Sequence, residues 1–166
     1  MHILEAHFNI TMAALRSILP LEAPADVALG RFFRDNTQLG PQDRHFVAET
    51  VFAILRRYRF LQTFCTDHMS NRRLLLAALV RVRGYSIKDI EHLARGDELD
   101  WLKKGKAIEL SALPLAIQAE VPDWLWDKLS AQYGEEQALA LCRAWQQSAG
   151  LDIRVNTIKA QRDTVL

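Results

Sequence analysis

Long apolar runs are missing from this 166-residue sequence. No stretch approaches the ~18 apolar residues that a membrane-spanning helix requires. The first eleven residues carry Glu5 and several polar side chains, which does not fit the pattern of a secretory signal. The two absences predict a cytoplasmic protein with no membrane partner.

Cysteine is scarce, and the signatures of metal and nucleotide sites are absent. Cys65 and Cys142 lie far apart and neither belongs to a C-x-x-C pair, so we expect two buried, reduced thiols and no zinc site. The five histidines are scattered, and no H-E-x-x-H motif or glycine-rich phosphate loop occurs. No Ser/His/Asp set can be defended from spacing. The sequence therefore predicts no catalytic residue, no cofactor-binding residue and no metal ligand in this chain.

What the sequence does contain is helical periodicity, which predicts an all-α fold class. The clearest stripe implies one buried helix face over five turns. Ser86, followed three residues later by Asp89, is typical of a helix start. We expect five helices in residues 1–96. The residues of the clearest stripe are Val47, Val51, Ile54, Tyr58, Leu61 and Cys65.

The second half of the chain changes character. Residues 96–105 are polar and charged, which predicts a surface loop or linker. Helices are expected again within 113–119, 122–134 and 135–150. At 151–157 the period switches to two, which predicts a strand, and 160–166 resembles the start of a helix. A lone strand has nothing to pair with, so we expect this chain to be cut from a larger protein.

Charge is concentrated although the net charge is only +1. Residues 56–83 hold seven arginines and one acid, whereas residues 84–140 hold 11 acids and six bases. Arginine binds phosphate through its planar fork and stacks on unpaired bases. We predict that this arginine band lies largely on one contiguous surface and binds RNA. Its members are Arg56, Arg57, Arg59, Arg72, Arg73, Arg81 and Arg83.

Alternatives for the band remain open. Exposed arginines are often merely solvated, or paired with acids of other helices. Arg57 lies nearer the buried stripe than Arg56 and is expected to pair with Glu49 or Asp67. Arg72 and Arg73 open a predicted helix, where extra cations are unfavourable, and an anion site would explain their placement. Interleaved aromatic residues can stack on bases, although Tyr58 is better explained as core. The aromatic residues are Tyr58, Phe60, Phe64 and Tyr85.

Two stretches carry a family likeness. Residues 39–61, with Asp43-Arg44 followed by a helix ending in Leu55-Arg56, are similar to the third helix of the NusB-like domains that open the Sun/Fmu (RsmB/NOP) family of ribosomal-RNA cytosine-5 methyltransferases. Residues 121–166 resemble that family's linker block and the strand-helix unit that leads to its catalytic core. The motifs there are Pro122-Asp123-Trp124-Leu125, Tyr133-Gly134-Glu135-Glu136 and Arg154-Val155-Asn156-Thr157.

The resemblance implies three regions. These are a NusB-like helical RNA-binding domain over 1–96, a linker and helical connecting block over 97–150, and the first strand and helix start of a truncated methyltransferase subdomain over 151–166. Family chemistry transfers a methyl group from S-adenosylmethionine to cytosine C5 with two cysteines of a downstream domain. Neither cysteine of this chain has a matching context, so the chain by itself is expected to have no methyltransferase activity and not to bind S-adenosylmethionine.

The expected function is that of the RNA-binding region of a 16S ribosomal-RNA cytosine-5 methyltransferase. Ribosomal RNA and a catalytic domain of the same polypeptide would be its partners, and Arg154 joins the band as an RNA-binding residue. One alternative is a stand-alone NusB-like RNA-binding module of transcription antitermination or ribosome assembly. Another is a purely structural helical domain that buttresses the catalytic half.

Overall fold

The computed structural model describes residues 3–64, 70–147 and 153–165, and within them every regular element is helical. This confirms the all-α prediction. Two short 3₁₀ turns lie at Glu91–Leu93 and Leu110–Ala112. The α-helices are α1 (Glu5–Ile18), α2 (Ala25–Asp35), α3 (Pro41–Arg56), α4 (Tyr58–Gln62), α5 (Asn71–Arg81), α6 (Ile87–Ile90), α7 (Glu98–Lys106), α8 (Leu115–Ala119), α9 (Asp123–Tyr133), α10 (Glu135–Trp145) and α11 (Arg162–Val165).

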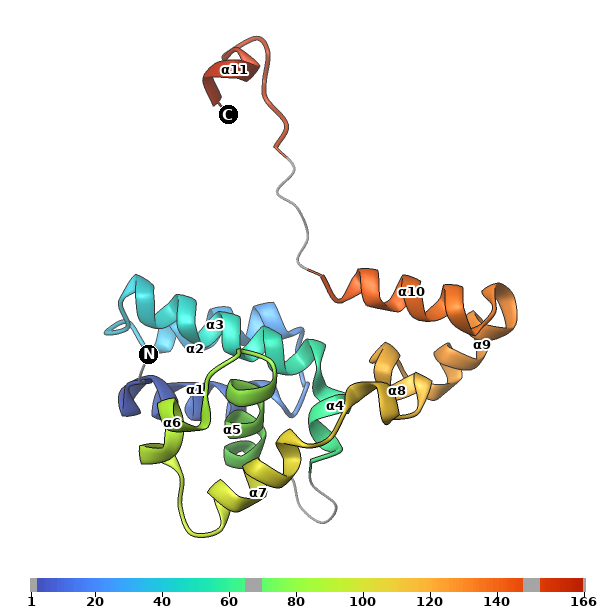
Figure 1. Cartoon of the computed structure of the whole chain (residues 1–166). Coiled ribbons are helices and arrows are strands. Elements are labelled where there is room, and N and C mark those ends of the chain that lie inside the picture. Colours follow the sequence, from blue (N-terminus) through green and yellow to red (C-terminus); the bar gives the residue numbers. More distant parts are fainter. Residues whose placement is uncertain (1–2, 65–69, 148–152, 166) are drawn as a thin grey trace.

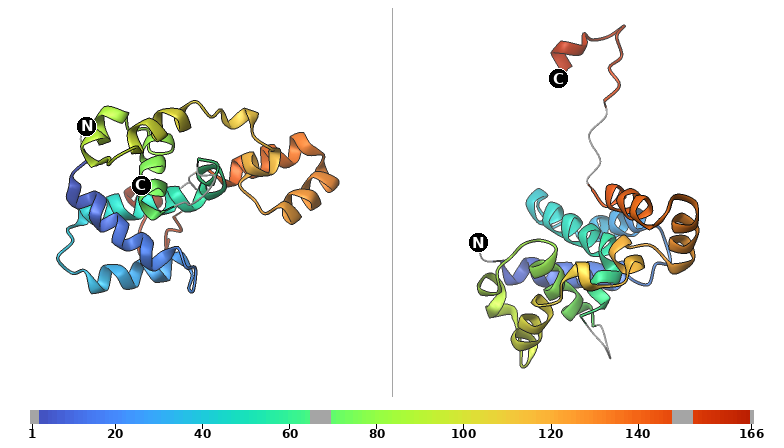
Figure 2. Two further views of the ribbon diagram at one scale, coloured as in Figure 1. Left: turned by 90° about the horizontal axis from the view of Figure 1, so that it is seen from below. Right: turned by 45° about the vertical axis from the view of Figure 1, so that its right-hand side comes forward.

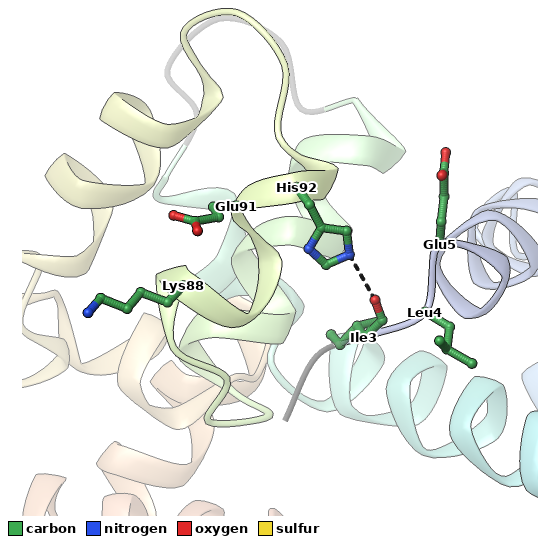
Figure 3. A pocket seen from close by; sticks show the side chains of 6 residues that line it. All are labelled: Ile3, Leu4, Glu5, Lys88, Glu91 and His92. Carbon is green, nitrogen blue, oxygen red and sulfur yellow. Dashed lines mark hydrogen bonds between the residues drawn. The ribbon is translucent and has the colours of Figure 1, made fainter.

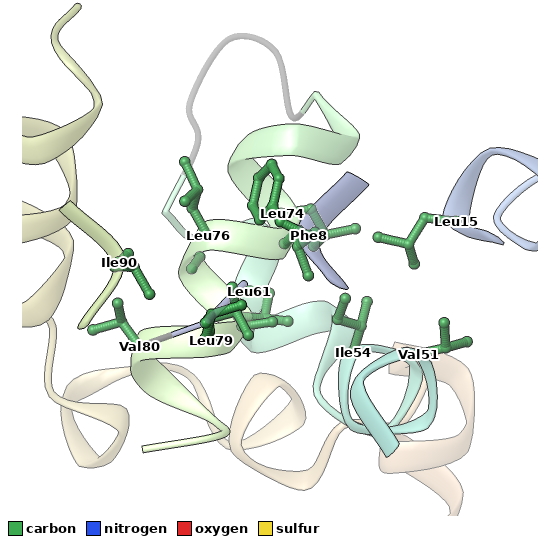
Figure 4. Packing of buried hydrophobic residues seen from close by; sticks show 14 of the residues in the cluster. Phe8, Leu15, Val51, Ile54, Leu61, Leu74, Leu76, Leu79, Val80 and Ile90 are labelled. Carbon is green, nitrogen blue, oxygen red and sulfur yellow. The ribbon is translucent and has the colours of Figure 1, made fainter. Parts of the chain in front are cut away.

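Helix α5 is the centre of the main body (Figure 1). Its residues 74–80 are all buried, so the helix is apolar around its whole circumference and needs neighbours on every side. Helices α1, α3, α4 and α7 supply them. Figure 4 shows Phe8 of α1 beside Leu74, with Ile54 and Val51 of α3 along the same core.

The start of α6 was readable from the sequence. The Ser86 hydroxyl accepts a hydrogen bond from the Asp89 amide at 3.2 Å, and the Asp89 carboxylate accepts one from the Ser86 amide at 2.9 Å. This reciprocal pair satisfies two donors that the helix itself leaves open. Helices between residues 70 and 95 therefore agree with the prediction.

The long helix predicted over 47–65 is interrupted. Helix α3 ends at Arg56, Arg57 has φ −124° and ψ 28°, and α4 starts at Tyr58. The cause is a residue distant in sequence. The carboxylate of Glu120 accepts hydrogen bonds from the amides of Arg59 and Phe60 at 2.9 and 3.1 Å, and thereby caps the new helix.

The surface loop predicted for residues 96–105 is wrong, because most of the segment is helix α7. Leu102 is buried, and the Trp101 indole donates to the Phe64 carbonyl at 2.9 Å. Gly105 lies so close to the Phe64 ring that an added Cβ would stand 2.3 Å from it. Apart from buried Glu98, the charged side chains of α7 face solvent, and they masked its buried stripe in the sequence.

A second, smaller core follows along α8, α9 and α10. It contains Ala119, Val121, Trp126, Ala138 and Cys142, with partly buried leucines around them. Figure 2 shows these helices at one end of the body, with α9 and α10 forming a hairpin. The domain limits at 96 and 150 stay predictions. The main core, however, takes in α7 and reaches partly buried Leu113.

The strand predicted for 151–157 is not confirmed by the structure. Residues 153–156 have no regular secondary structure and 157–159 form a turn, while 151 and 152 lie outside the described residues. A strand needs a neighbouring backbone for its ladder bonds, and no described segment supplies one here. The NusB-like character of the bundle is likewise not confirmed. Figure 1 shows residues 153–165 apart from the helical body.

Candidate nucleic-acid interface

The two arginines that open α5 are bound to acids of the same chain. Arg72 donates to both carboxylate oxygens of Glu98, at 2.9 and 3.0 Å, and also to the Leu93 carbonyl. Arg73 contacts both carboxylate oxygens of Asp97 at 3.0 Å. The carboxylates that these two arginines bind therefore come from the chain's own α7 region, and RNA binding by Arg72 and Arg73 stays a prediction. These contacts join α7 to α5.

Arg59 is also held internally. Its guanidinium donates to the Val121 carbonyl and to Asp123 at 2.8 Å, while its amide binds Glu120. Burial of Glu120 raises the pKa of that carboxyl group to about 7, although the two amide donors and the nearby Arg57 oppose the shift. Arg59 and Glu120 thus attach the second core to α4.

Arg81 and Arg83, at the other end of α5, contact mostly neutral groups. Arg81 donates to the carbonyl oxygens of Lys106 and Ile108 and lies 5.3 Å over the Phe60 ring, so no described carboxylate neutralises it. Arg83 binds Glu49 at 3.3 Å. Glu49, one expected partner of Arg57, is thus bound by Arg83, and the other, Asp67, lies outside the described residues.

Arg56 and Arg57 are the members of the band whose guanidinium groups bind no carboxylate or carbonyl in the described part of the chain. Arg56 is exposed, as its angular position on α3 predicted, and Arg57 is half-buried. Both line a hollow of about 280 Å³, and Arg57 also lines an adjoining one of about 200 Å³. Together the hollows are lined by four arginines and one glutamate, a net charge of +3. The residues of the two hollows are Glu49, Ala53, Arg56, Arg57, Phe60, Arg81, Val82, Arg83, Leu110 and Gln146.

The arginines of the band are spread along the length of α5. Arg72 and Arg81 are nine residues apart on α5, which separates them by about 13 Å along the helix axis. At the start of α5, Arg72 and Arg73 bind acids at the start of α7. At the end of α5, Arg81 binds carbonyl groups at the end of α7, and Arg81 and Arg83 line the two hollows. Only this end of α5 borders a hollow with guanidinium groups available to a ligand. This end of α5 is the candidate site.

The aromatic residues of the band are less available than the sequence suggested. Phe60 and Phe64 are buried and pack edge-to-face with ring centroids 5.3 Å apart. Tyr58 and Tyr85 are half-buried against the main core, which agrees with the core interpretation of Tyr58. Base stacking at this site would need another aromatic side chain.

One site residue that sequence reasoning missed lies at the end of α10. Gln146 follows the last residue of α10 and donates through Nε2 to the Ala119 carbonyl at 2.9 Å. It lines the larger hollow together with Arg56, although the two are far apart in sequence. No sequence signal marks this meeting, because it depends on how the second core packs on α3.

Other candidate sites carry no comparable chemistry. A hollow of about 390 Å³ near the first helix combines Glu5, Lys88, Glu91 and His92, but Figure 3 shows Lys88 and Glu5 extending away from His92. His92 itself is hydrogen bonded to the Ile3 carbonyl at 2.9 Å. Among the described residues no cluster of histidine, cysteine or acidic side chains can hold a metal ion.

The remaining predicted residues are placed as follows. Arg154 is exposed and lies in residues 153–165, apart from the band. Cys142 is buried in the second core, and burial raises the pKa of its thiol, as expected for an inert cysteine. Cys65 lies outside the described residues. Within the described part, no helix combines the length and apolar character needed to span a membrane.

Comparisons with known proteins bear on both halves of the chain. Residues 121–166 match the family model of the RsmF/B-like methyltransferase ferredoxin-like domain. The chain is also 25% identical to a probable ribosomal RNA small subunit methyltransferase B of Synechocystis, over 93% of this chain. The chain is related to the Sun/Fmu family. No solved structure matches it.

The chain is shorter than the relative that it matches. The match spans 42% of the length of the Synechocystis relative. The family model begins at Val121, so its match covers α9 and α10 together with residues 153–165. The boundary between the two cores lies at the same place. Val121 belongs to the second core, and its carbonyl accepts a hydrogen bond from Arg59 of α4.

Proposed function

We propose that this chain is the RNA-binding region of a 16S ribosomal-RNA cytosine-5 methyltransferase that uses S-adenosylmethionine. In this proposal the chain positions ribosomal RNA for a catalytic domain of the same cytoplasmic polypeptide. The relationship to the Sun/Fmu family supports the substrate class. The family model over α9, α10 and the following residues favours this function over a stand-alone NusB-like module.

The observation that carries the proposal is the pair Arg56 and Arg57. Both residues line a hollow of about 280 Å³, and their guanidinium groups have no hydrogen-bond partner in the described part of the chain. Arginines that only stabilise the fold are bonded, as Arg59, Arg72 and Arg73 are. An unbonded pair at a hollow is what phosphate binding requires, because the donors must be available to the ligand.

The test is the salt dependence of binding to a fragment of small-subunit ribosomal RNA. Removing one arginine that binds a phosphate should reduce the slope of log K against log salt by about 0.7 to 0.9. Replacing both residues, R56A/R57A, should therefore lower the slope by about 1.4 to 1.8. The matched control is R31A/R34A, which removes the same charge from the exposed face of α2. Equal slopes for both variants would contradict the proposal.

A structural role is the second candidate, because five of the seven band arginines are bonded within the chain. Arg72 and Arg73 tie α7 to α5, and Arg59 ties the second core to α4. A domain that only buttresses a catalytic half would have such contacts and no RNA affinity. Failure of the wild-type chain to bind the RNA fragment at low salt would make this the preferred function.

A further inference from the structure

We propose that the hollow at Arg56 and Arg57 binds single-stranded RNA, with Trp145 stacking on an unpaired base beside it. The inference rests on the proposed RNA-binding function and adds the type of RNA and the residue that receives a base. It joins two features: a basic hollow, and an exposed indole on the residue before Gln146, which lines that hollow.

Trp145 is in the right place because it immediately precedes Gln146. Gln146 lines the hollow, and adjacent Cα atoms are about 3.8 Å apart. Figures 1 and 2 show the end of α10 beside the end of α3. A strand whose phosphate occupies the hollow therefore has its next base within reach of the indole.

The end of α10 is also held firmly. Gln146 donates to the carbonyls of Gln118 and Ala119 at 3.4 and 2.9 Å, and Arg143 donates to the Gln118 side chain at 3.2 Å. These bonds fix the last turn of α10 on α8. A rigid helix end favours base stacking, because the protein loses less conformational entropy when the base binds.

Trp145 is exposed although it lies on a helix that packs against the second core. The indole is 55% exposed although its helix packs through Ala138 and Cys142 into the second core. Arg56, which lines the hollow together with Gln146, is exposed as well, whereas the guanidinium group of Arg143 is bound to the Gln118 side chain. Aromatic and basic residues side by side are the combination that binds single strands, since a duplex hides the base faces.

Bound bases have room only if they are unpaired. The two adjoining hollows have volumes of about 280 and 200 Å³, and the residues that line them carry a net charge of +3. That space suits a phosphate and its ribose. A helix of double-stranded RNA would contact the rim with phosphates alone and leave the indole without a partner. The site therefore distinguishes looped or single-stranded ribosomal RNA from paired RNA.

The test measures binding of the whole chain to a labelled oligouridylate of about ten nucleotides. W145A should weaken affinity by about fivefold to a hundredfold with an unchanged salt slope. R56A/R57A should instead lower the slope by about 1.4. W124A is the matched control, because Trp124 is 62% exposed on α9, a helix that contributes no residue to either hollow. A duplex of equal length should compete poorly.

Each other outcome has a definite meaning. If W145A and W124A bind as the wild type does, or if the duplex competes equally, the single-strand proposal is overturned while RNA binding stands. If the wild type binds neither the oligonucleotide nor the ribosomal fragment, the proposed function fails as well. Circular dichroism of each variant confirms that the helices remain folded.

Discussion

The absence of a side chain at Gly105 allows α7 to pack closely against the main core. A methyl group there would meet the ring of Phe64 at 2.3 Å. That ring cannot move aside readily, because it is buried against Phe60 and under Arg81. Single residues thus control contacts between elements that lie far apart in sequence.

Replacing this glycine, G105A, should destabilise the protein by about 1 to 3 kcal/mol through overpacking. The matched control is G30A within α2, where the nearest atom would be 3.6 Å away. G30A should stabilise by about 0.4 to 1 kcal/mol, because alanine has less conformational freedom to lose. Urea unfolding measures both. A G105A variant as stable as G30A would show that α7 does not lie against Phe64.

Glu120 should make the junction of the two cores pH-dependent. Its folded-state pKa of about 7 lies above its ordinary value of 4.5, because burial disfavours the charged form. Its contribution to stability is therefore complete below about pH 4.5 and is lost as the pH rises through about 7. Thermal unfolding of the wild type and E120Q should differ increasingly in favour of E120Q between pH 5 and 8. A pH-independent difference would refute this.

At the scale of elements, two ion pairs join the start of α7 to the start of α5. The Arg72–Glu98 pair is largely buried, with side chains 20% and 10% exposed. The Arg73–Asp97 pair nearby is much more exposed on its acidic side. Arg72 and Arg73 are neighbours on one helix, but we expect their ion pairs to contribute unequally to the free energy of unfolding, because solvent screens mainly the Arg73–Asp97 pair.

The variant R72A should destabilise the fold by about 3 kcal/mol, because it leaves the Glu98 carboxylate buried without its partner. R73A should cost at most about 1 kcal/mol, since exposed pairs contribute little. Chemical denaturation compares them directly. Similar losses for the two variants would mean that burial of the first pair has no energetic consequence. The result also decides whether Arg72 can be used to test RNA binding without affecting the fold.

At the scale of the whole molecule, two hydrophobic cores share one junction. The main core surrounds α5, and the second lies among α8, α9 and α10. Arg59, Glu120 and Asp123 supply polar contacts between them. A small core of this kind can open without the main body, since local unfolding follows the local density of packing.

Replacing the central aromatic residue of the second core tests that independence. W126A should destabilise this unit by about 3 to 5 kcal/mol, whereas W124A, at an exposed site two residues earlier, should change stability by about 0.5 kcal/mol or less. Amide hydrogen exchange should then quicken in α9 and α10 of W126A and stay slow in α5. Equal loss of protection in α5 would mean that the two cores unfold together.

The sequence by itself determined most of the helices, though not α7 or the break after α3, and much of the core. Apolar spacing located α1, α3, α5 and α9, and the Ser86–Asp89 pair located the start of α6. These features depend on residues three or four apart, which a helix brings together through local geometry. The exposure of Arg56 also followed from its angle on α3.

Only the tertiary structure decided what the arginines do. Glu98 lies 26 residues after Arg72, and Glu120 lies 61 residues after Arg59, so neither pairing has a local signal. The same holds for the break after α3 and for the meeting of Gln146 with Arg56. Charge counting finds a basic band, but the partners of each guanidinium depend on chain folding. Five arginines bind acids or carbonyl groups of the chain. Arg56 and Arg57 line a hollow without a hydrogen-bond partner among the described residues, because acids and carbonyls from distant helices come within bonding distance of some positions and not of others.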